Sequence, residues 1–386
     1  LIGSWMQTMA LGWLSLQLSN SAFVVGLVAS IGALPVVFLS MHAGALVDRA
    51  DRLKVVRATQ TVFLCQAVAL WLLTWTGHAT IGVLMTLAFV QGVASAIEVP
   101  ARQSMIIQLV GRDDLQPAIA LNSSGFNLAR IVGPALGGLI IHRFGIAWCF
   151  GLNALSFVAV LWGLFLIRLP AVPSSFAGTT LTRVLTDATR DAVAGLRYLD
   201  QPGVVRDLLS LVTVGAIFGA PFITLMPVLA RDRLLLDAGG YGVMLAALGV
   251  GGLTGALMIA GPASHWPRGR VLRVTGISFP LLVIVLAFTT DARIAEALLF
   301  VIGVVMIMFN ALTNGILQLR VPEEFRGRLM AFYSLVFIGL SQVIGSFATG
   351  AVAKAVGVEW AVAGSAMVTL GFAGYTFRRS KELATV

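Results

Sequence analysis

Two charged residues stand out because they lie inside or at the end of long apolar segments, where ionised side chains are rare. Arg130 is about 13 residues into the apolar stretch 117–141, which places it about 20 Å along a helix. A charge at this depth is unfavourable and usually faces a cavity or a partner. We expect Arg130 to bind an anionic group of a substrate, to pair with an acid, or to bond backbone carbonyls.

Glu98 is the second such residue, and it ends the apolar stretch 80–98, just before Pro100. A carboxyl group can take up and release a proton, so Glu98 is a candidate proton carrier. Arg102 follows four residues later, which is the spacing of ion pairs along a helix. The alternative is therefore a structural carboxylate paired with Arg102 at the membrane interface.

A third group of charges follows the apolar stretch 22–47 and consists of Asp48, Arg49, Arg52 and Lys54, preceded by Gly44. The helix dipole disfavours an acid at the C-terminal end of a helix, so Asp48 needs a cation or a helix N-terminus beside it. Such a pair can hold one conformation and break in another. The pattern predicts a gating latch, and the alternative is an ordinary positively charged loop.

Arg130 is followed by a run of small residues at Gly133, Pro134, Gly137 and Gly138. Glycines spaced in this way let two membrane helices approach closely. The proline removes one backbone hydrogen bond and can bend its helix. We interpret the run as the element that shapes this helix, and the alternative is a packing face without a role in ligand binding.

These residues must be positioned by membrane helices, because 58% of the 386 residues are hydrophobic and only 11% are charged. Soluble globular chains have about 25% charged residues. The composition therefore excludes a soluble globular protein and a disordered one. Stretches long enough to cross a bilayer are predicted at 1–19, 22–47, 54–76, 80–98, 117–141, 145–168, 203–229, 240–263, 271–290, 294–317, 327–353 and 358–377.

The positive charges are distributed unevenly between the two sets of connections. Of the 26 Lys and Arg residues, 20 lie in or near one alternating set of loops and the C-terminal tail, and only five lie in the opposite set. The positive-inside rule then places both ends of the chain in the cytoplasm. The net charge of +9 is thus explained by topology, and we do not expect a nucleic-acid partner. The chain begins inside an apolar stretch, so we expect its first helix to lack its N-terminal start.

The longest connection divides the chain into two halves. It predicts a bundle over 1–168, a cytoplasmic linker with an amphipathic helix over 169–202, and a second bundle with a short tail over 203–386. A shift of 212 residues aligns Gly133 with Gly345 and Trp148 with Trp360, which indicates a duplication. The same shift aligns Glu98 with Asn310 and Arg130 with Gln342. The charges of Glu98 and Arg130 therefore have no charged counterpart in the second half.

Other chemistries are not supported by the sequence. It has no P-loop, no zinc-ligand spacing and no catalytic triad. The two cysteines, Cys65 and Cys149, lie in apolar stretches and do not predict a disulfide framework or a metal site. We expect neither enzyme activity nor a cofactor, and an ion gradient as the energy source.

The loop from Gly44 to Lys54 resembles the signature between helices two and three of the major facilitator superfamily, with Asp51 where the family usually has a second glycine. The element Gly133-Pro134-x-x-Gly137-Gly138 is similar to the helix-five antiporter signature of that superfamily. The stretch 100–138 resembles the branch with bacterial enterobactin and multidrug exporters. The resemblance implies an all-α integral membrane fold of twelve transmembrane helices in two pseudo-symmetric six-helix bundles.

The resemblance also implies a cavity between the bundles, lined by spans one, four, seven and ten. The candidate cavity residues are then Arg130, Glu98, Gln7, Gln91, Asn127, Asn310, Phe218 and Phe222. The implied function is proton-coupled export of a small amphipathic molecule, such as a siderophore, drug or metabolite, by a monomer in the lipid bilayer. The alternatives are an importer or uniporter, or a membrane protein that transports nothing, such as a sensor or a lipid-handling enzyme.

Overall fold

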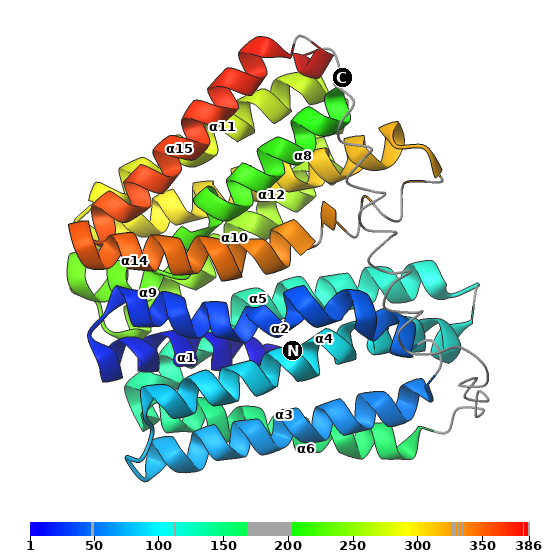
Figure 1. Ribbon diagram of the computed structural model, residues 1–386, viewed down its shortest axis with the longest axis vertical. Helices are drawn as coiled ribbons and strands as arrows, with labels where there is room; N and C mark the ends of the chain where they lie inside the picture. The colour runs from blue at the N-terminus through cyan, green and yellow to red at the C-terminus, as the bar shows by residue number, and fades with distance from the viewer. Residues whose placement is uncertain are drawn as a thin grey trace. The chain divides into compact units, whose positions relative to one another are not determined.

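The computed structural model describes residues 1–47, 50–111, 113–167, 203–323, 325, 329, 332–333, 335–380 and 382–384. The contacts group the chain into two compact units (Figure 1). The first unit contains Leu1–Ser19 and Ile31–Asp191, and the second contains Asn20–Ser30 and Ala192–Val386. The linker predicted at 169–202, with its amphipathic helix, lies outside the described residues.

The helices of the first half are long and mostly regular. They are α1 (Ile2–Ser19), α2 (Ala22–Val47), α3 (Arg52–Trp75), α4 (Ile81–Val110), α5 (Leu115–Phe144) and α6 (Ala147–Leu166). Within the first unit, α1 packs on α5 and α6, and α3 packs on α4 and α6.

The second half contains more irregular helix. Its first segment changes from α to π and 3₁₀ geometry around two prolines, and η6 is also a π-helix. The elements are α8 (Val204–Val214), η2 (Gly215–Gly219), η3 (Ala220–Phe222), α9 (Met226–Val228), η4 (Leu229–Arg233), α10 (Ala238–Ala260), η5 (Pro262–His265), α11 (Arg268–Phe288), α12 (Ala292–Arg320), η6 (Leu335–Ser346), α14 (Phe347–Val356), α15 (Val358–Arg379) and η7 (Glu382–Ala384).

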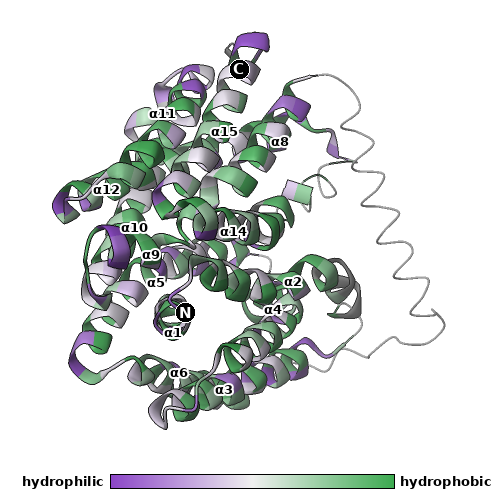
Figure 2. Ribbon diagram, turned by 60° about the vertical axis from the view of Figure 1, so that its left-hand side comes forward, coloured by the Kyte–Doolittle hydropathy of each residue, from purple (hydrophilic) through white to green (hydrophobic). Residues whose placement is uncertain are grey.

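The described segments are long and apolar, as the composition predicts. Nine of them have the length and hydropathy needed to cross a membrane. Figure 2 shows hydrophobic residues along most of the helix lengths and hydrophilic ones mainly near the ends. Burying apolar side chains between helices while others face lipid requires this near-continuous hydrophobicity.

One predicted boundary is wrong, because α4 does not end at Glu98 but continues through Pro100 to Val110. The extension is held by packing: Ala101 and Met105 are buried in one cluster with Leu53 and Val56 of α3. A proline inside a helix removes one backbone hydrogen bond, and this burial compensates for the loss. Glu98 is therefore inside a helix and not at its end.

Asp51, which departs from the family signature, has a clear local role. It is the N-cap of α3, and its side chain accepts hydrogen bonds from the backbone N–H groups of Leu53 (3.1 Å) and Lys54 (3.2 Å). A capping carboxylate also interacts favourably with the helix dipole. Asp51 therefore starts α3 through its side chain at the position where the signature has a glycine.

The helix boundaries follow the internal repeat. Shifting α5 and α6 by 212 residues predicts helix ends at 356 and 378, and α14 and α15 end at Val356 and Arg379. Under the same shift, α4 corresponds to 293–322, and α12 spans Ala292–Arg320. The two halves therefore share segment lengths as well as isolated glycines.

Candidate functional site

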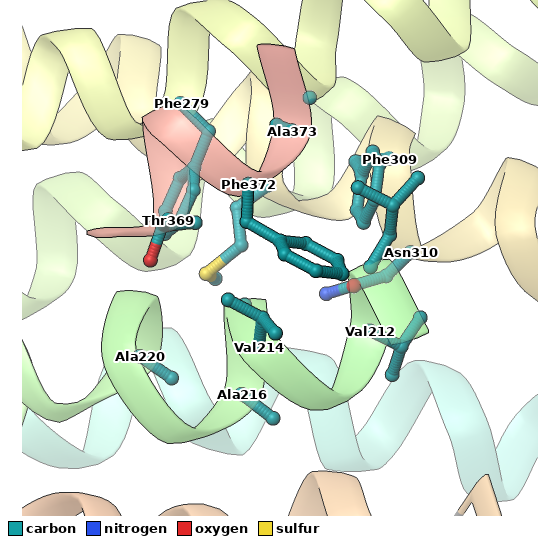
Figure 3. Close-up of a pocket in the computed structure, with 14 residues that line it drawn as sticks. Val212, Val214, Ala216, Ala220, Phe279, Phe309, Asn310, Thr369, Phe372 and Ala373 are labelled. Atoms are coloured by element: carbon teal, nitrogen blue, oxygen red, sulfur yellow. The ribbon is translucent and has the colours of Figure 1, made fainter. Parts of the chain in front are cut away.

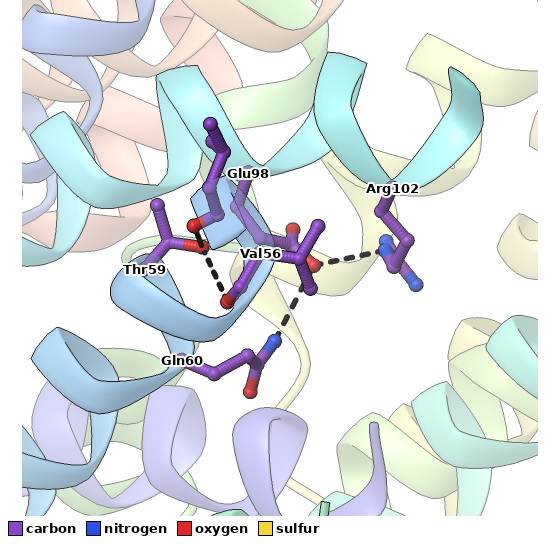
Figure 4. Close-up of polar contacts among 6 residues, drawn as sticks. Val56, Thr59, Gln60, Glu98 and Arg102 are labelled. Atoms are coloured by element: carbon purple, nitrogen blue, oxygen red, sulfur yellow. Dashed lines mark hydrogen bonds and ion pairs between the residues drawn. The ribbon is translucent and has the colours of Figure 1, made fainter. Parts of the chain in front are cut away.

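The first candidate site is the carboxyl group of Glu98 in α4, shown in Figure 4. Glu98 is only 6% exposed. Its Oε1 atom lies 3.0 Å from Nε of Arg102 and accepts a 3.4 Å hydrogen bond from Nε2 of Gln60 on α3. The carboxylate is thus compensated by one cation and one amide.

The packing of α3 on α4 positions these groups. Gln60 is buried, and the hydroxyl of Thr59 beside it donates to the backbone carbonyls of Val55 and Val56, so the Thr59 side chain does not compete for Glu98. The Arg102 side chain is 32% exposed, whereas that of Glu98 is 8% exposed. Protonation of Glu98 would remove the charge that holds Arg102, so the arrangement can couple a proton to the position of a side chain.

A cluster of amides, three of them buried and the fourth partly buried, joins four helices of the first unit. Nε2 of Gln7 on α1 donates to Oε1 of Gln66 on α3 (2.9 Å) and to Oε1 of Gln91 on α4 (3.3 Å). Nε2 of Gln66 also donates to Oε1 of Gln91 (3.3 Å), and Nδ2 of Asn153 on α6 donates to Oε1 of Gln7 (2.8 Å). Buried polar groups need such partners. Contact between a substrate and Gln7 or Gln91 stays a prediction, and it would compete with these bonds.

Arg130 lies against an aromatic ring. Its guanidinium carbon is 5.9 Å from the centroid of the Trp5 ring on α1, and Trp5 in turn packs edge-on against Phe126, with 5.6 Å between centroids. A cation within about 6 Å of an indole face is stabilised by the ring quadrupole. Among the described residues no carboxylate pairs with Arg130, so this charge is available for an anionic group. Asn127 is exposed and donates to the backbone carbonyl of Ser123 (2.9 Å).

The small residues after Arg130 form the contact between α5 and α1. An added Cβ at Gly133 would lie 2.6 Å from Cβ of Trp5, and one at Gly137 would lie 3.1 Å from Sδ of Met9. Pro134 and Gly138 are also buried. Only glycine permits this approach at Gly133, so the run sets the position of α5 on α1 and hence of Arg130 over Trp5.

The predicted gating loop is described only in part. Asp48 and Arg49 lie outside the described residues, and Gly44 lies within α2. Arg52 begins α3, and the ammonium of Lys54 is 3.6 Å from Asp51. The latch between Asp48 and a neighbouring helix stays a prediction.

The candidate residues of the second unit are separated. Asn310 lies on α12 and lines a pocket, whereas the ring of Phe222 is 1% exposed and packs edge-on against Phe279, with 6.2 Å between centroids. Phe218 is 37% exposed and does not line that pocket. Of these three residues, Asn310 lines this pocket, and Phe218 and Phe222 do not.

Several residues of these sites were not singled out by the sequence patterns. Gln60, Gln66 and Asn153 are polar residues in apolar stretches, which was the available signal, but nothing in the sequence showed which of them meet. The phenylalanines that line the pocket have no such signal, because aromatic residues are common in membrane helices. Among the described residues, no group of three or more His, Cys, Asp or Glu side chains could hold a metal ion.

Comparison with known proteins places these observations in a family. A family model described as transmembrane secretion effector matches residues 1–383. The multidrug efflux pump Tap of Mycolicibacterium fortuitum is 27% identical, over 99% of this chain and 93% of Tap. The staphyloferrin A transporter of Staphylococcus aureus is 27% identical over 67% of this chain and 63% of that protein, and the enterobactin exporter EntS of Shigella flexneri is 26% identical over 83% and 71%.

Solved structures share the fold at low sequence identity. A bacterial homologue of the human lysosomal transporter Spinster aligns with a TM-score of 0.74 at 13% identity, over 98% of this chain and 94% of that one. A D-xylose–proton symporter aligns with a TM-score of 0.72 at 12% identity, over 100% and 97%.

Proposed function

Since the chain belongs to the transmembrane secretion effector family of major facilitator transporters, we propose that it exports a small amphipathic molecule in exchange for protons. The chain has the major facilitator fold and is a multi-span helical membrane protein. It is a transporter and not an enzyme. We place it in the bacterial inner membrane, with both termini on the cytoplasmic side, and expect it to act as a monomer.

The direction and substrate class are supported by its relatives. Those named above are a multidrug efflux pump, a staphyloferrin A transporter and an enterobactin exporter, and the Tap protein matches along nearly its whole length. Drugs and siderophores have in common a small size and a mixture of polar and apolar groups. We therefore propose substrates of this amphipathic class.

The observation that carries the proton coupling is the buried carboxyl group of Glu98, paired with Arg102 and held by Gln60. A carboxylate inside an apolar bundle is stable while it is paired, and binding a proton neutralises it. Protonation then frees Arg102, whose side chain is already partly exposed. In alternating access, a state that favours the charged pair and a state that favours the neutral acid would bind the proton with different affinities.

Arg130 and Trp5 are the proposed contact for the substrate. The guanidinium offers charge and hydrogen-bond donors, and the indole offers an apolar face. Both are held by the glycine contact of α5 on α1, so their geometry is preorganised. An amphipathic molecule with an acidic or carbonyl group beside an apolar part fits this pair.

The test is transport into proteoliposomes containing the purified chain, with the lumen about two pH units more acidic than the outside. One-for-one exchange predicts up to about 100-fold accumulation of a transported dye or siderophore, because each pH unit corresponds to a tenfold ratio. Glu98→Gln should reduce the accumulation ratio to about one. Glu296→Gln on α12 is the matched control, and it should retain accumulation.

The outcomes separate the alternatives. If a gradient of either sign drives no accumulation and a broad panel of amphipathic compounds leaves the gradient intact, antiport is excluded. Equilibration without accumulation would indicate a uniporter, and accumulation toward the alkaline side would indicate an importer coupled to protons. Full accumulation by Glu98→Gln would assign the proton to another group.

A further inference from the structure

A pocket lies inside the second unit, between α8 and η2 on one side and α11, α12 and α15 on the other. Its lining includes three phenylalanines, one methionine and two polar residues, namely Phe279, Phe309, Phe372, Met306, Asn310 and Thr369. Figure 3 shows the Phe372 ring and the Asn310 amide facing the space between these helices. All lining residues belong to the second unit, so the pocket is complete within it.

Small residues make room for the pocket. Gly215, Ala216 and Ala220 line the side formed by η2 and the start of η3. At Gly215 an added Cβ would meet nothing within 4 Å, so the space above this glycine is open. This wall is π-helical from Gly215 to Gly219, and π-helical turns inside membrane helices are frequent at functional sites.

The lining specifies the chemistry of an occupant. Three phenylalanine rings, one each from α11, α12 and α15, line the space, and such rings pack favourably against another aromatic ring. Asn310 is partly buried, and its amide forms no hydrogen bond with any described residue. The Thr369 hydroxyl donates to the carbonyl of Ser365 (3.1 Å) and can still accept. No charged side chain lines the pocket.

We propose that this pocket binds the uncharged aromatic part of the exported molecule, a ring that carries a hydrogen-bonding group. The ring would lie among Phe279, Phe309 and Phe372, and its hydroxyl or amine would bond the Asn310 amide. The assignment as a substrate subsite rests on the proposed export function. A lipid acyl chain fits less well, because it would bury the Asn310 amide without giving it a partner.

The pocket is tested by binding of tritiated 2-naphthol to the full chain in lipid nanodiscs, with empty nanodiscs as the background. Gly215→Leu should abolish saturable binding, because the new side chain enters the open space. The backbone at Gly215 is right-handed helical (φ −62°), so leucine is tolerated there. The matched control is Gly371→Leu on α15, where a Cβ also meets nothing within 4 Å and which does not line the pocket. It should bind as the wild type does.

The hydrogen bond is tested by Asn310→Leu. It should weaken 2-naphthol binding by about fivefold to tenfold, the value of one hydrogen bond of about 1 kcal/mol. Naphthalene, which lacks the hydroxyl, should bind the variant and the wild type alike. Unchanged or tighter 2-naphthol binding by Asn310→Leu would overturn the proposed chemistry and leave a purely apolar pocket.

Two further results would overturn the site itself: no saturable binding by the wild type, or equal binding by Gly215→Leu and Gly371→Leu. These measurements need no gradient. Intact binding without gradient-driven accumulation would therefore count against the antiport proposal alone. Transport by the wild type without 2-naphthol binding would count against the pocket alone.

Discussion

The clearest contrast in the molecule is between the middle of α4 and the middle of α12, which the internal repeat makes equivalent. In α4, Glu98 and Arg102 form an ion pair held by Gln60. In α12, the corresponding residues are Asn310, which faces a pocket, and Asn314, which accepts a hydrogen bond from Gln318. The same helix register thus carries charge in one half and neutral amides in the other.

The contacts of the small residues do not differ in this way. A Cβ at Gly133 would meet Trp5 of α1 at 2.6 Å, and one at the equivalent Gly345 would meet the carbonyl oxygen of Ile217 in η2 at 2.5 Å. Both glycines let a helix approach the first helical segment of its own half. Close packing at glycine is therefore common to both halves, whereas the ion pair in the middle of α4 has no ionisable equivalent in α12.

The largest expected effect comes from copying the α12 amides into α4, as Glu98→Asn with Arg102→Asn. Accumulation driven by two pH units should fall from up to about 100-fold to about one, because the protonatable group is removed while no charge is left unpaired. Transport in proteoliposomes measures this effect. Retained accumulation in the double variant would break the contrast between the two helices.

A stability measurement accompanies this exchange. Arg102→Asn alone leaves the Glu98 carboxylate without its cation, so it should lower the midpoint of thermal unfolding in detergent more than the double variant does. Circular dichroism follows the transition. Equal midpoints for the two variants would mean that the ion pair contributes nothing to the folded state.

The next effect concerns packing. Gly133→Ala should lower the free energy of unfolding by about 2 kcal/mol, because the new methyl would overlap Cβ of Trp5 on α1. Gly345→Ala should have a similar effect in the second half. Gly125→Ala is the control on α5, where a Cβ meets nothing within 4 Å. A tolerated Gly133→Ala together with a damaging Gly345→Ala would show that the halves pack differently.

Arg130→Gln gives position 130 the residue type of its equivalent in the second half, Gln342. The side chain of Gln342 accepts hydrogen bonds from Thr224 (3.3 Å) and Ser346 (3.1 Å). Removing the guanidinium should reduce the transport rate at least about tenfold, roughly the value of one charge-assisted hydrogen bond. Membrane insertion should be unchanged, as measured by the yield of protein in the membrane fraction. A wild-type rate would leave Arg130 with a role only in packing on Trp5.

The smallest expected effect is at the start of α3. Asp51→Ala removes the side-chain cap and should lower the free energy of unfolding by about 1 kcal/mol. In the second half, α11 begins after Pro267 with no side-chain cap, so Pro267→Ala should change unfolding less. An equal loss for both variants would contradict a specific capping role for Asp51.

The sequence predicted the sites unevenly, and particular residues show why. The depth of Arg130 and the pairing of Glu98 with Arg102 could be predicted, since both depend on spacing along one helix. The end of α4 could not, because Pro100 is a local signal for a boundary and the packing of Ala101 and Met105 on α3 overrides it. The amide cluster of Gln7, Gln66, Gln91 and Asn153 joins four helices and has no local signature.

The sequence by itself determined that this protein lies in a membrane, which segments are helices, that the halves repeat, and which of them carries the charges. These properties depend on hydropathy, helical period and residue identity, all of which are local. Only the tertiary structure decided which groups meet: Gln60 with Glu98, Trp5 with Arg130, and Asn310 with three phenylalanine rings. Packing between distant helices settles such contacts, because many side chains must fill the same space at once.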